Sequence, residues 1–510
     1  MDIKNKILTT ALLLFISYSA MAQFGSTFEL SDLNGENGLI INGENDGDWL
    51  GAYLAHIGDV NDDGINDILV SAPGAEGGKA YVIYGNSQGY SSPFDLSSLN
   101  GNNGFVINNT GSFNRTSKAG DINGDKIDDI IIGGVFASHV IFGRDTAFTS
   151  ELDTADLNGS NGFVINGYVQ EFEDGYRKSS GGDLNGDGLN DVVIATNGDS
   201  SDKGIVYVLF GSDQPYSASV DISLVSGSNG FIINGQNDND RLGRYLSIVG
   251  DINNDGIDDL SVSKATQNDE FGNDIFSDSY VIFGSGQPFM SNFDLSTLNG
   301  SNGFKIPSID SLWLTSGDGA NVNAAGDINH DGIDDLVIGY GGVNNGAGQA
   351  YVIYGKSEAF NASFDLSSLN GTNGFSINSL KNYGFVGARI NTIGDVNADG
   401  VDDIMLLALQ FGESGENYIT SYVIYGSEQL FPSNFDLSSI NGANGFAIKS
   451  FSNQAFKGIS SISSPGDFNN DGIDDMLVGV LAEGENNSET GAAYIIYGRG
   501  DLIFDNGFED

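Results

Sequence analysis

Cysteine is absent from the 510 residues, so neither a disulfide nor a thiolate metal site can hold this fold together. Basic residues are also scarce, because Lys and Arg number 20 against 69 Asp and Glu, which gives a net charge of −49. A surface this acidic repels nucleic acid and anionic membranes and attracts cations. We therefore expect no nucleic-acid partner. The alternative reading of the charge is an acidic surface that only keeps the protein soluble.

Long apolar runs are missing everywhere except near the N-terminus. Lys4 and Lys6 precede an apolar stretch over residues 7–18, and Ala20-Met21-Ala22 fits a small-x-small cleavage site. This pattern predicts a signal peptide over residues 1–22 and a mature chain that begins at Gln23. The protein would then be exported, either secreted or held at the cell surface. An uncleaved N-terminal anchor is the alternative. No other run reaches ~18 apolar residues, so we expect no transmembrane segment in the mature chain.

The residues that are abundant indicate β structure. Glycine contributes 73 residues and Tyr and Phe contribute 20 and 32, whereas proline contributes only 7. Glycine permits the positive φ angles of tight turns, and aromatic side chains suit the half-buried surface of a sheet. The 39% hydrophobic residues are enough for a packed core.

Three sequence blocks recur seven times each, in the same order. One resembles FDLSSLNGNNGFVINN, which begins at Phe94, and another is the aromatic block AYVIYG, which begins at Ala80. The third is acidic, reads GDVNDDGINDILV in its first copy, and begins at Gly58, Gly120, Gly182, Gly250, Gly326, Gly394 and Gly466. Successive acidic blocks are 62, 62, 68, 76, 68 and 72 residues apart. A period of this length, made of short strands and glycine turns, is typical of four strands per unit.

The phase of the repeats predicts how the units assemble. In the first unit we expect strands over residues 53–57, 68–71, 80–84 and 105–108, with the acidic loop between the first two. The last unit ends at its aromatic strand, whereas a spare GFxI-type strand, residues 38–42, precedes the first unit. That N-terminal strand can complete the last unit and close a ring. An open solenoid is the alternative, but it would need distinct capping repeats, which the sequence lacks.

The sequence therefore predicts an all-β, seven-bladed β-propeller of four-stranded antiparallel blades, closed by the N-terminal strand. The propeller would span residues 23–498, and residues 499–510 would form a C-terminal tail.

The acidic loops share the form D-x-N-x-D-G-x-x-D. Calcium takes six to eight oxygen ligands, which positions 1, 3, 5 and 9 can supply from side chains and position 7 from its backbone carbonyl. Magnesium suits such a loop less well, and zinc would want the Cys or His that is missing here. The expected ligands of up to seven Ca²⁺ ions are Asp59, Asn61, Asp63, Ile65, Asp67, Asp121, Asn123, Asp125, Ile127, Asp129, Asp183, Asn185, Asp187, Leu189, Asp191, Asp251, Asn253, Asp255, Ile257, Asp259, Asp327, Asn329, Asp331, Ile333, Asp335, Asp395, Asn397, Asp399, Val401, Asp403, Asp467, Asn469, Asp471, Ile473 and Asp475.

These loops differ from EF-hands. An EF-hand has a glutamate at position 12 between two helices, whereas position 12 here is apolar and lies in a predicted strand, as at Val70. A single loop of this kind could be a plain Asx-rich turn, but seven copies with the same Asp and Asn positions favour metal binding. In the second loop Lys126 replaces the glycine of position 6, so we expect that site to be the weakest.

The acidic loops, the glycine after each aromatic strand, and segments such as Trp49-Leu50-Gly51 and Ser71-Ala72-Pro73 resemble the FG-GAP repeats of the integrin α-subunit N-terminal β-propeller. Similar repeats occur in phosphatidylinositol-glycan-specific phospholipase D and in bacterial surface proteins. The resemblance covers residues 28–498. It implies calcium sites on one face of the ring and partner binding on the opposite face. Integrins carry such loops in only some blades, whereas every blade has one here, which suggests that calcium replaces disulfides as a structural staple.

The expected function is a secreted or cell-surface calcium-binding module that recognises a protein or glycan, as in adhesion, and works as a monomer. A structural matrix protein whose main ligand is calcium is one alternative, and a propeller hydrolase is another. We expect no enzyme, because His56, His139 and His330 fall at unrelated repeat positions and no nucleophile or phosphate-loop motif occurs. Trp49 and Trp313 lie in divergent segments, where they could contact a ligand or simply pack.

Overall fold

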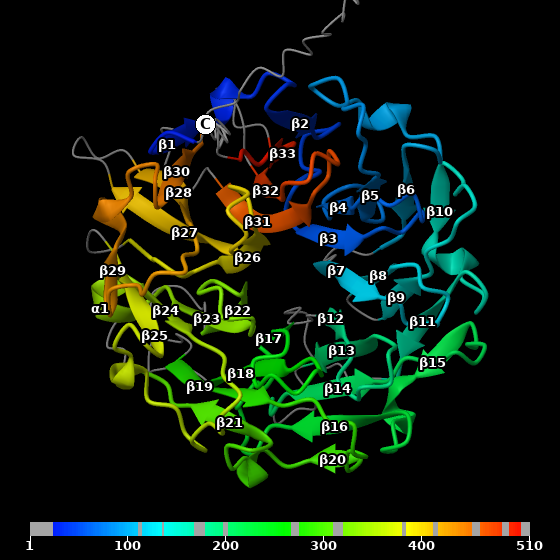
Figure 1. Ribbon diagram of the computed structural model, residues 1–510. Coiled ribbons are helices and arrows are strands. Elements are labelled where there is room, and N and C mark those ends of the chain that lie inside the picture. Colours follow the sequence, from blue (N-terminus) through cyan, green and yellow to red (C-terminus); the bar gives the residue numbers. More distant parts are fainter. Residues whose placement is uncertain are drawn as a thin grey trace, which may run out of the picture.

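The computed structural model describes residues 24–110, 115–134, 137–167, 179–196, 202–266, 275–309, 320–379, 384–411, 417–450, 459–481 and 489–500. The predicted signal peptide, most of the predicted tail and Trp313 lie outside these ranges. Within them, seven sheets are arranged around a central axis, and the chain passes through them in order from blue to red (Figure 1). The predicted seven-bladed β-propeller is confirmed.

Four antiparallel strands form the body of each blade. The innermost strands are β3 (Leu54–Gly58), β7 (Arg115–Gly120), β12 (Ser179–Gly182), β17 (Tyr245–Ile248), β22 (Asn321–Gly326), β26 (Ile390–Gly394) and β31 (Ile459–Gly466). The second strands are β4 (Asp67–Ala72), β8 (Asp129–Gly133), β13 (Asp191–Thr196), β18 (Leu260–Thr266), β23 (Asp335–Tyr340), β27 (Asp403–Phe411) and β32 (Asp475–Val480). The third strands, which carry the aromatic block, are β5 (Lys79–Ile83), β9 (Ser138–Ile141), β14 (Ile205–Leu209), β19 (Ile275–Ile282), β24 (Gln349–Ile353), β28 (Asn417–Ile424) and β33 (Ala492–Ile496). The fourth strands are β6 (Gly104–Asn108), β11 (Gly162–Asn166), β16 (Gly230–Asn234), β21 (Gly303–Ile306), β25 (Gly374–Asn378), β30 (Gly445–Lys449) and β2 (Gly38–Asn42).

The N-terminal strand closes the ring. β2 pairs antiparallel with β33, with Gly38 opposite Ile496 and Asn42 opposite Ala492. The blue and red ends of the chain consequently meet in one blade (Figure 1). Because this pairing covers the outer edge of the last aromatic strand, the seventh blade has its four strands although its own repeat supplies only three.

Five blades hold one strand more than the sequence predicts. A short parallel strand joins the fourth strand of each of these blades. In four of them it lies between the third and fourth strands of the following repeat, as when β10 pairs with β6, and in the fifth the strand β1, which precedes β2 near the N-terminus, pairs with β30. These fifth strands are β1 (Thr27–Glu29), β10 (Glu151–Asp153), β15 (Ser219–Asp221), β20 (Asn292–Phe293) and β29 (Asn434–Asp436). The added strand covers the outermost edge of the sheet and ties neighbouring blades together.

Short 3₁₀ turns follow the segments that pair in parallel with the fourth strands. Seven 3₁₀ turns are described, at Leu30–Asp32, Leu96–Ser98, Thr154–Asp156, Ile222–Leu224, Leu295–Thr297, Leu366–Ser368 and Leu437–Ser439, and one helical turn, α1, at Val343–Gly346. In six of the 3₁₀ turns the preceding aspartate caps the turn, as Asp95 does by accepting the N–H of Ser97 at 3.0 Å. The aspartate of the FDLSS block is therefore a capping residue.

The apolar core lies between adjacent blades. At six seams the phenylalanine of a fourth strand stacks on an aromatic ring from the next repeat, with centroids 4.1–4.5 Å apart. Phe105 on Phe148 is one such pair. At the seventh seam, fully buried Leu39 replaces the phenylalanine. These stacked pairs fix the rotation of each blade against its neighbour and so place the seven acidic loops equivalently around the ring.

Candidate calcium loops and central channel

Each acidic loop connects the innermost strand of a blade to the second strand. All 35 residues predicted as ligands are described, and the seven loops share nearly the same internal contacts. In the first loop, the two carboxylate oxygens of Asp59 accept the N–H groups of Asp63 at 3.0 Å and Gly64 at 2.7 Å. The Asp63 carboxylate in turn accepts the N–H of Ile65 at 2.9 Å. The loop is thereby wound around the carboxylate of position 1.

The glycine of position 6 makes this winding possible. Gly64 has φ +85°, a left-handed conformation that residues with a Cβ adopt only at a cost. Lys126 takes the same place in the second loop with φ +72°, and its N–H still donates to Asp121 at 2.8 Å. The second loop therefore keeps the common shape with a strained residue at its turn.

The aspartate of position 9 turns inward. Asp67 is fully buried and accepts the N–H of Val60 at 3.0 Å and of Gly85 at 2.9 Å. All seven loops repeat these two bonds, which join each loop to the glycine after its aromatic strand. The recurring glycine of the AYVIYG block is thus a partner of the loop carboxylate.

Burial of this position opposes its negative charge. Desolvation, reinforced by the carboxylates of positions 1 and 5, raises the pKa of Asp191 to about 8 and that of Asp259 to about 9. The pKa of the other five position-9 carboxyls is raised well above its usual value for the same reasons. A cation beside the loop would offset this cost by favouring the charged form.

The asparagine of position 3 completes the polar set. In six loops its side-chain oxygen accepts the N–H of position 5, as Asn61 does for Asp63 at 3.1 Å. The fourth loop differs, because the Oδ1 atom of Asn253 is buried and has no hydrogen-bond partner. An acceptor oxygen left in this state is costly unless a donor or a cation reaches it.

The predicted metal ligands of every loop are oxygen atoms only, which suits a hard cation such as calcium. No group of three or more Asp, Glu or His side chains in the described ranges is positioned to hold a metal ion by itself. Metal binding would therefore also need the asparagine oxygen and the position-7 carbonyl, together with a shift of the position-9 side chain. The ligand assignment stays a prediction.

The residue at position 8, which is not among the predicted ligands, joins neighbouring loops to one another. The Oδ2 atom of Asp128 in the second loop accepts the N–H of Asp59 in the first at 3.0 Å. Equivalent bonds are formed by Asn190, Asp258, Asp334, Asp402 and Asp474, at 2.8–3.0 Å. The glycine before position 1 makes room, because a Cβ on Gly58 would overlap the Asp128 carboxylate. An Asn or Asp at position 8 of every loop is the sequence signal for this contact.

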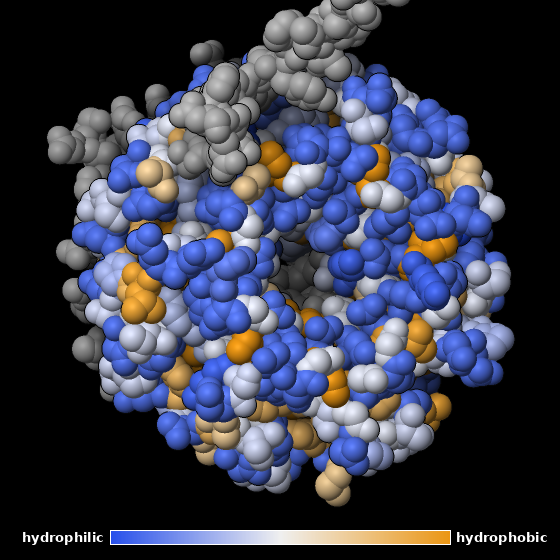
Figure 2. Space-filling model, in the orientation of Figure 1, coloured by the Kyte–Doolittle hydropathy of each residue, from blue (hydrophilic) through white to orange (hydrophobic). Residues whose placement is uncertain are grey.

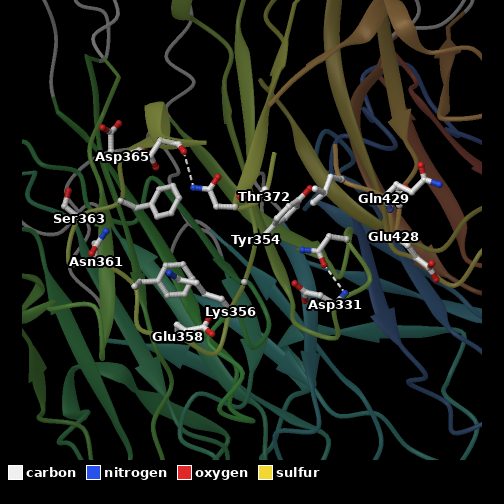
Figure 3. Close-up of a pocket in the computed structure, with 18 residues that line it drawn as sticks. Asp331, Tyr354, Lys356, Glu358, Asn361, Ser363, Asp365, Thr372, Glu428 and Gln429 are labelled. Carbon is white, nitrogen blue, oxygen red and sulfur yellow. Dashed lines mark hydrogen bonds between the residues drawn. The ribbon is translucent and has the colours of Figure 1, made fainter. Parts of the chain in front are cut away.

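A pocket of about 550 Å³ opens beside the fifth loop (Figure 3). Asn329 and Asp331 of the loop line it, together with Tyr354 and Lys356 after the aromatic strand and Leu430 of the next repeat. The Tyr354 hydroxyl is buried without a hydrogen-bond partner. The pocket thus brings the fifth loop into contact with the surface of two blades.

A larger cavity, of about 720 Å³, occupies the centre of the ring, and Figure 2 shows the hollow at that place on a largely hydrophilic face. All seven innermost strands contribute to its wall. His56 is one of the lining residues, and its Nε2 atom lies 3.1 Å from Oδ1 of Asn66. Burial and the charge of Lys118 lower the pKa of His56 to about 4, so the ring is neutral at physiological pH.

The remaining residues singled out from the sequence lie apart from the channel or at its edge. His139 is on β9, opposite Ile132 and Val164, and His330 is half-exposed, 3.8 Å from Glu428. Trp49 is 43% exposed and lines the central cavity. The three histidines therefore form no common site. In the described part of the chain, no helix has the length and apolar character needed to cross a membrane.

Comparison with known proteins identifies the repeat. Residues 52–83, 176–209, 320–353 and 461–496 match the FG-GAP repeat. These segments belong to the first, third, fifth and seventh blades, and with the seven-bladed ring they are consistent with a propeller of the integrin α-subunit N-terminal type. FG-GAP propellers are in general binding or structural modules.

A comparison with curated proteins gave no match. Among solved structures, the chain is similar to the V. cholerae biofilm matrix protein Bap1, with 11% identity over 93% of this chain and 90% of that one and a TM-score of 0.30. A TM-score this low supports no inference about function.

Proposed function

We propose that this protein is an exported, calcium-stabilised propeller that acts as a binding or adhesion module for a protein or glycan. The observation that carries the proposal is the ring of seven similar loops, each of which offers only oxygen atoms as metal ligands, and in which position 8 bonds neighbouring loops at six seams. A scaffold with no cysteine can be stabilised outside the cell by ions in place of disulfides.

Seven ions would make a large combined contribution. A ligand that binds only the folded state stabilises it by RT ln(1 + [L]/Kd) at each site, so even weak sites in millimolar calcium add up around the ring. Each ion would also neutralise part of the repulsion among the carboxylates of positions 1, 5 and 9. Calcium would thus act on the scaffold, and recognition would be left to the surfaces that diverge between repeats.

The hydrolase alternative has little support in the described channel. His56 pairs with an asparagine side chain, and among the residues that the structure describes, those that line the channel include no Asp or Glu that could act with it. The matrix alternative differs from the binding proposal in one respect, because a purely structural protein needs no selective ligand surface.

Array binding separates these alternatives. The mature chain from Gln23 is applied to arrays of glycans and extracellular proteins in millimolar calcium, with heat-unfolded chain as the control for nonspecific adsorption. The proposal expects retention on a defined subset of spots. Binding to no spot by a folded, calcium-loaded chain would contradict the binding function and leave the structural role.

A further inference from the structure

The aromatic residue before the glycine of the AYVIYG block differs among the blades. It is tyrosine in the first, fifth, sixth and seventh blades and phenylalanine in the others, in the order Tyr84, Phe142, Phe210, Phe283, Tyr354, Tyr425 and Tyr497. In six blades this ring packs against the phenylalanine of the fourth strand, with centroids 5.8–6.3 Å apart and planes at 55–66°. Because phenylalanine and tyrosine share this packing, the hydroxyl is not needed to hold the ring in place.

Two of these tyrosine hydroxyls are buried and unpaired. Tyr84 is 4% exposed and Tyr354 is 7% exposed, and within the described part of the chain neither hydroxyl has a hydrogen-bond partner. A polar group in this state opposes folding unless another group comes within its reach. Phenylalanine would avoid that cost at both positions, as it does in three other blades. The two hydroxyls therefore call for a partner that the packing of the blades does not supply.

In the fifth blade the hydroxyl belongs to the surroundings of the acidic loop. The N–H of Gly355, the residue after Tyr354, donates to the position-9 carboxylate of Asp335 at 2.8 Å. Tyr354 also lines the same pocket as Asn329 and Asp331, at positions 3 and 5 of the loop (Figure 3). Burial, and then the charges of Asp335 and Asp331, raise the pKa of Tyr354. The hydroxyl consequently keeps its proton and can donate it in a hydrogen bond.

The first blade repeats this arrangement. The N–H of Gly85, next to Tyr84, donates to the position-9 carboxylate of Asp67 at 2.9 Å. Burial and the charges of Asp67 and Asp63 raise the pKa of Tyr84, against the opposing charge of Arg144. In both blades, therefore, a buried proton donor without a partner accompanies the carboxylates of positions 5 and 9.

We propose that these hydroxyls are outer-shell donors of the calcium loops and divide the seven loops into two affinity classes. Each loop offers five ligand residues, whereas calcium takes six to eight oxygens, so water can fill the remaining positions. A hydroxyl that donates to such a water favours the loaded loop, and groups of this kind typically change metal affinity by 10–100-fold. The tyrosine loops (first, fifth, sixth and seventh) would thus bind calcium more tightly than the phenylalanine loops (second, third and fourth).

The two classes occupy two continuous arcs of the ring. Because β2 pairs with β33, the seventh blade adjoins the first, and the four tyrosine loops follow one another without interruption. The blade that closes the ring lies inside this tighter arc. Calcium would therefore secure the closure at concentrations that leave the phenylalanine loops largely unloaded. The inference rests on the proposed calcium-stabilised scaffold and adds the order in which its loops fill.

The test counts bound calcium by equilibrium dialysis of the chain from Gln23 over a range of free calcium. We expect about four ions to bind first and about three more at roughly tenfold higher free calcium. Tyr354→Phe should change this division to three and four, and the reciprocal variant Phe283→Tyr in the neighbouring blade should change it to five and two. Tyr81→Phe is the matched control, because the Tyr81 hydroxyl donates to Glu44 at 3.0 Å, and it should leave the division unchanged.

Thermal unfolding separates this role from a purely structural one. In excess chelator Tyr354→Phe should be at least as stable as the parent chain, because an unpaired buried hydroxyl is removed, whereas in calcium it should be less stable. A binding curve of Tyr354→Phe that matches the parent curve, or an equal destabilisation with and without calcium, overturns the inference. Seven bound ions in the parent chain would then still support the proposed calcium-stabilised scaffold, whereas no bound calcium in the folded parent chain would contradict both.

Discussion

Asp258 in the fourth acidic loop is bonded twice to Asp183 in the third, although 75 residues separate them. Its carboxylate accepts the Asp183 N–H at 2.9 Å, and its own N–H donates to the Asp183 carbonyl at 3.1 Å. The first of these bonds recurs at five more seams, so the loop face of the propeller is a ring of cross-blade contacts. Any ion held by one loop is therefore next to the backbone that shapes the adjacent loop.

Removal of this contact should destabilise the ring. Asp258→Ala leaves the Asp183 N–H without its partner, and we expect a loss of about 1–3 kcal/mol in the free energy of unfolding. Asp258→Asn should cost much less, because Asn190 makes the same contact at its seam through an amide oxygen. Urea unfolding in calcium measures both variants. Equal stabilities of the alanine and asparagine variants would contradict a hydrogen-bonding role.

Replacement of Lys126 by glycine should stabilise the second loop. Lys126 holds φ +72° where the other loops have glycine, and relief of this strain is expected to add about 1 kcal/mol. Calcium should also bind this loop more tightly, because an ammonium group is removed beside the carboxylates. Gly188→Lys in the third loop is the reciprocal variant and should lose what Lys126→Gly gains. Calorimetric titration and thermal unfolding report the two effects.

Substitution of one ligand should remove one ion. Asp255→Ala deletes the position-5 carboxylate of the fourth loop, and we expect the bound calcium to fall by about one per chain while the ring stays folded. Asn254, at the non-ligand position 4 of the same loop with φ +58°, offers the control Asn254→Gly, which preserves that conformation. Full calcium stoichiometry in the Asp255 variant would show that the ligand assignment is wrong.

His139 should make stability dependent on pH. Burial lowers its pKa from 6.5 to about 4, and its Nδ1 atom has no hydrogen-bond partner. The unfolded chain thus binds a proton at a higher pH than the folded chain does, so stability falls as the pH drops from about 6.5 towards 4. His139→Val should remove this part of the pH dependence, whereas His330→Asn should not. The measurement is the unfolding midpoint of both variants and of the parent chain across this pH range. An unchanged pH dependence in the His139→Val variant would contradict the prediction.

The strands of the blades could be predicted closely because the same residue pattern recurs in all seven repeats. The strand expected over 80–84 is β5, Lys79–Ile83, and the closing strand expected over 38–42 is β2, Gly38–Asn42. The fifth strands could not be predicted, because their residues pair with the previous blade and their own repeat contains no partner for them.

The candidate site was harder to predict, because its contacts also join residues that are far apart in the sequence. The order of donors in Asp59–Asp67 indicates a cation loop, but the sequence cannot show that Asp67 turns towards Gly85 or that Asp128 bonds to Asp59. The central channel was beyond prediction, since Lys118 and Arg389 lie on different blades and become neighbours of one cavity only when the ring closes.

The most direct test of the account is thermal unfolding of the mature chain in millimolar calcium and then in excess chelator, with bound calcium counted in the same sample. We predict about seven ions per chain and a large fall in the melting temperature on chelation, because every loop would lose the cation that compensates its carboxylates. No bound calcium together with an unchanged melting temperature would mean that the acidic loops are only turns and that hydrogen bonds alone hold the ring.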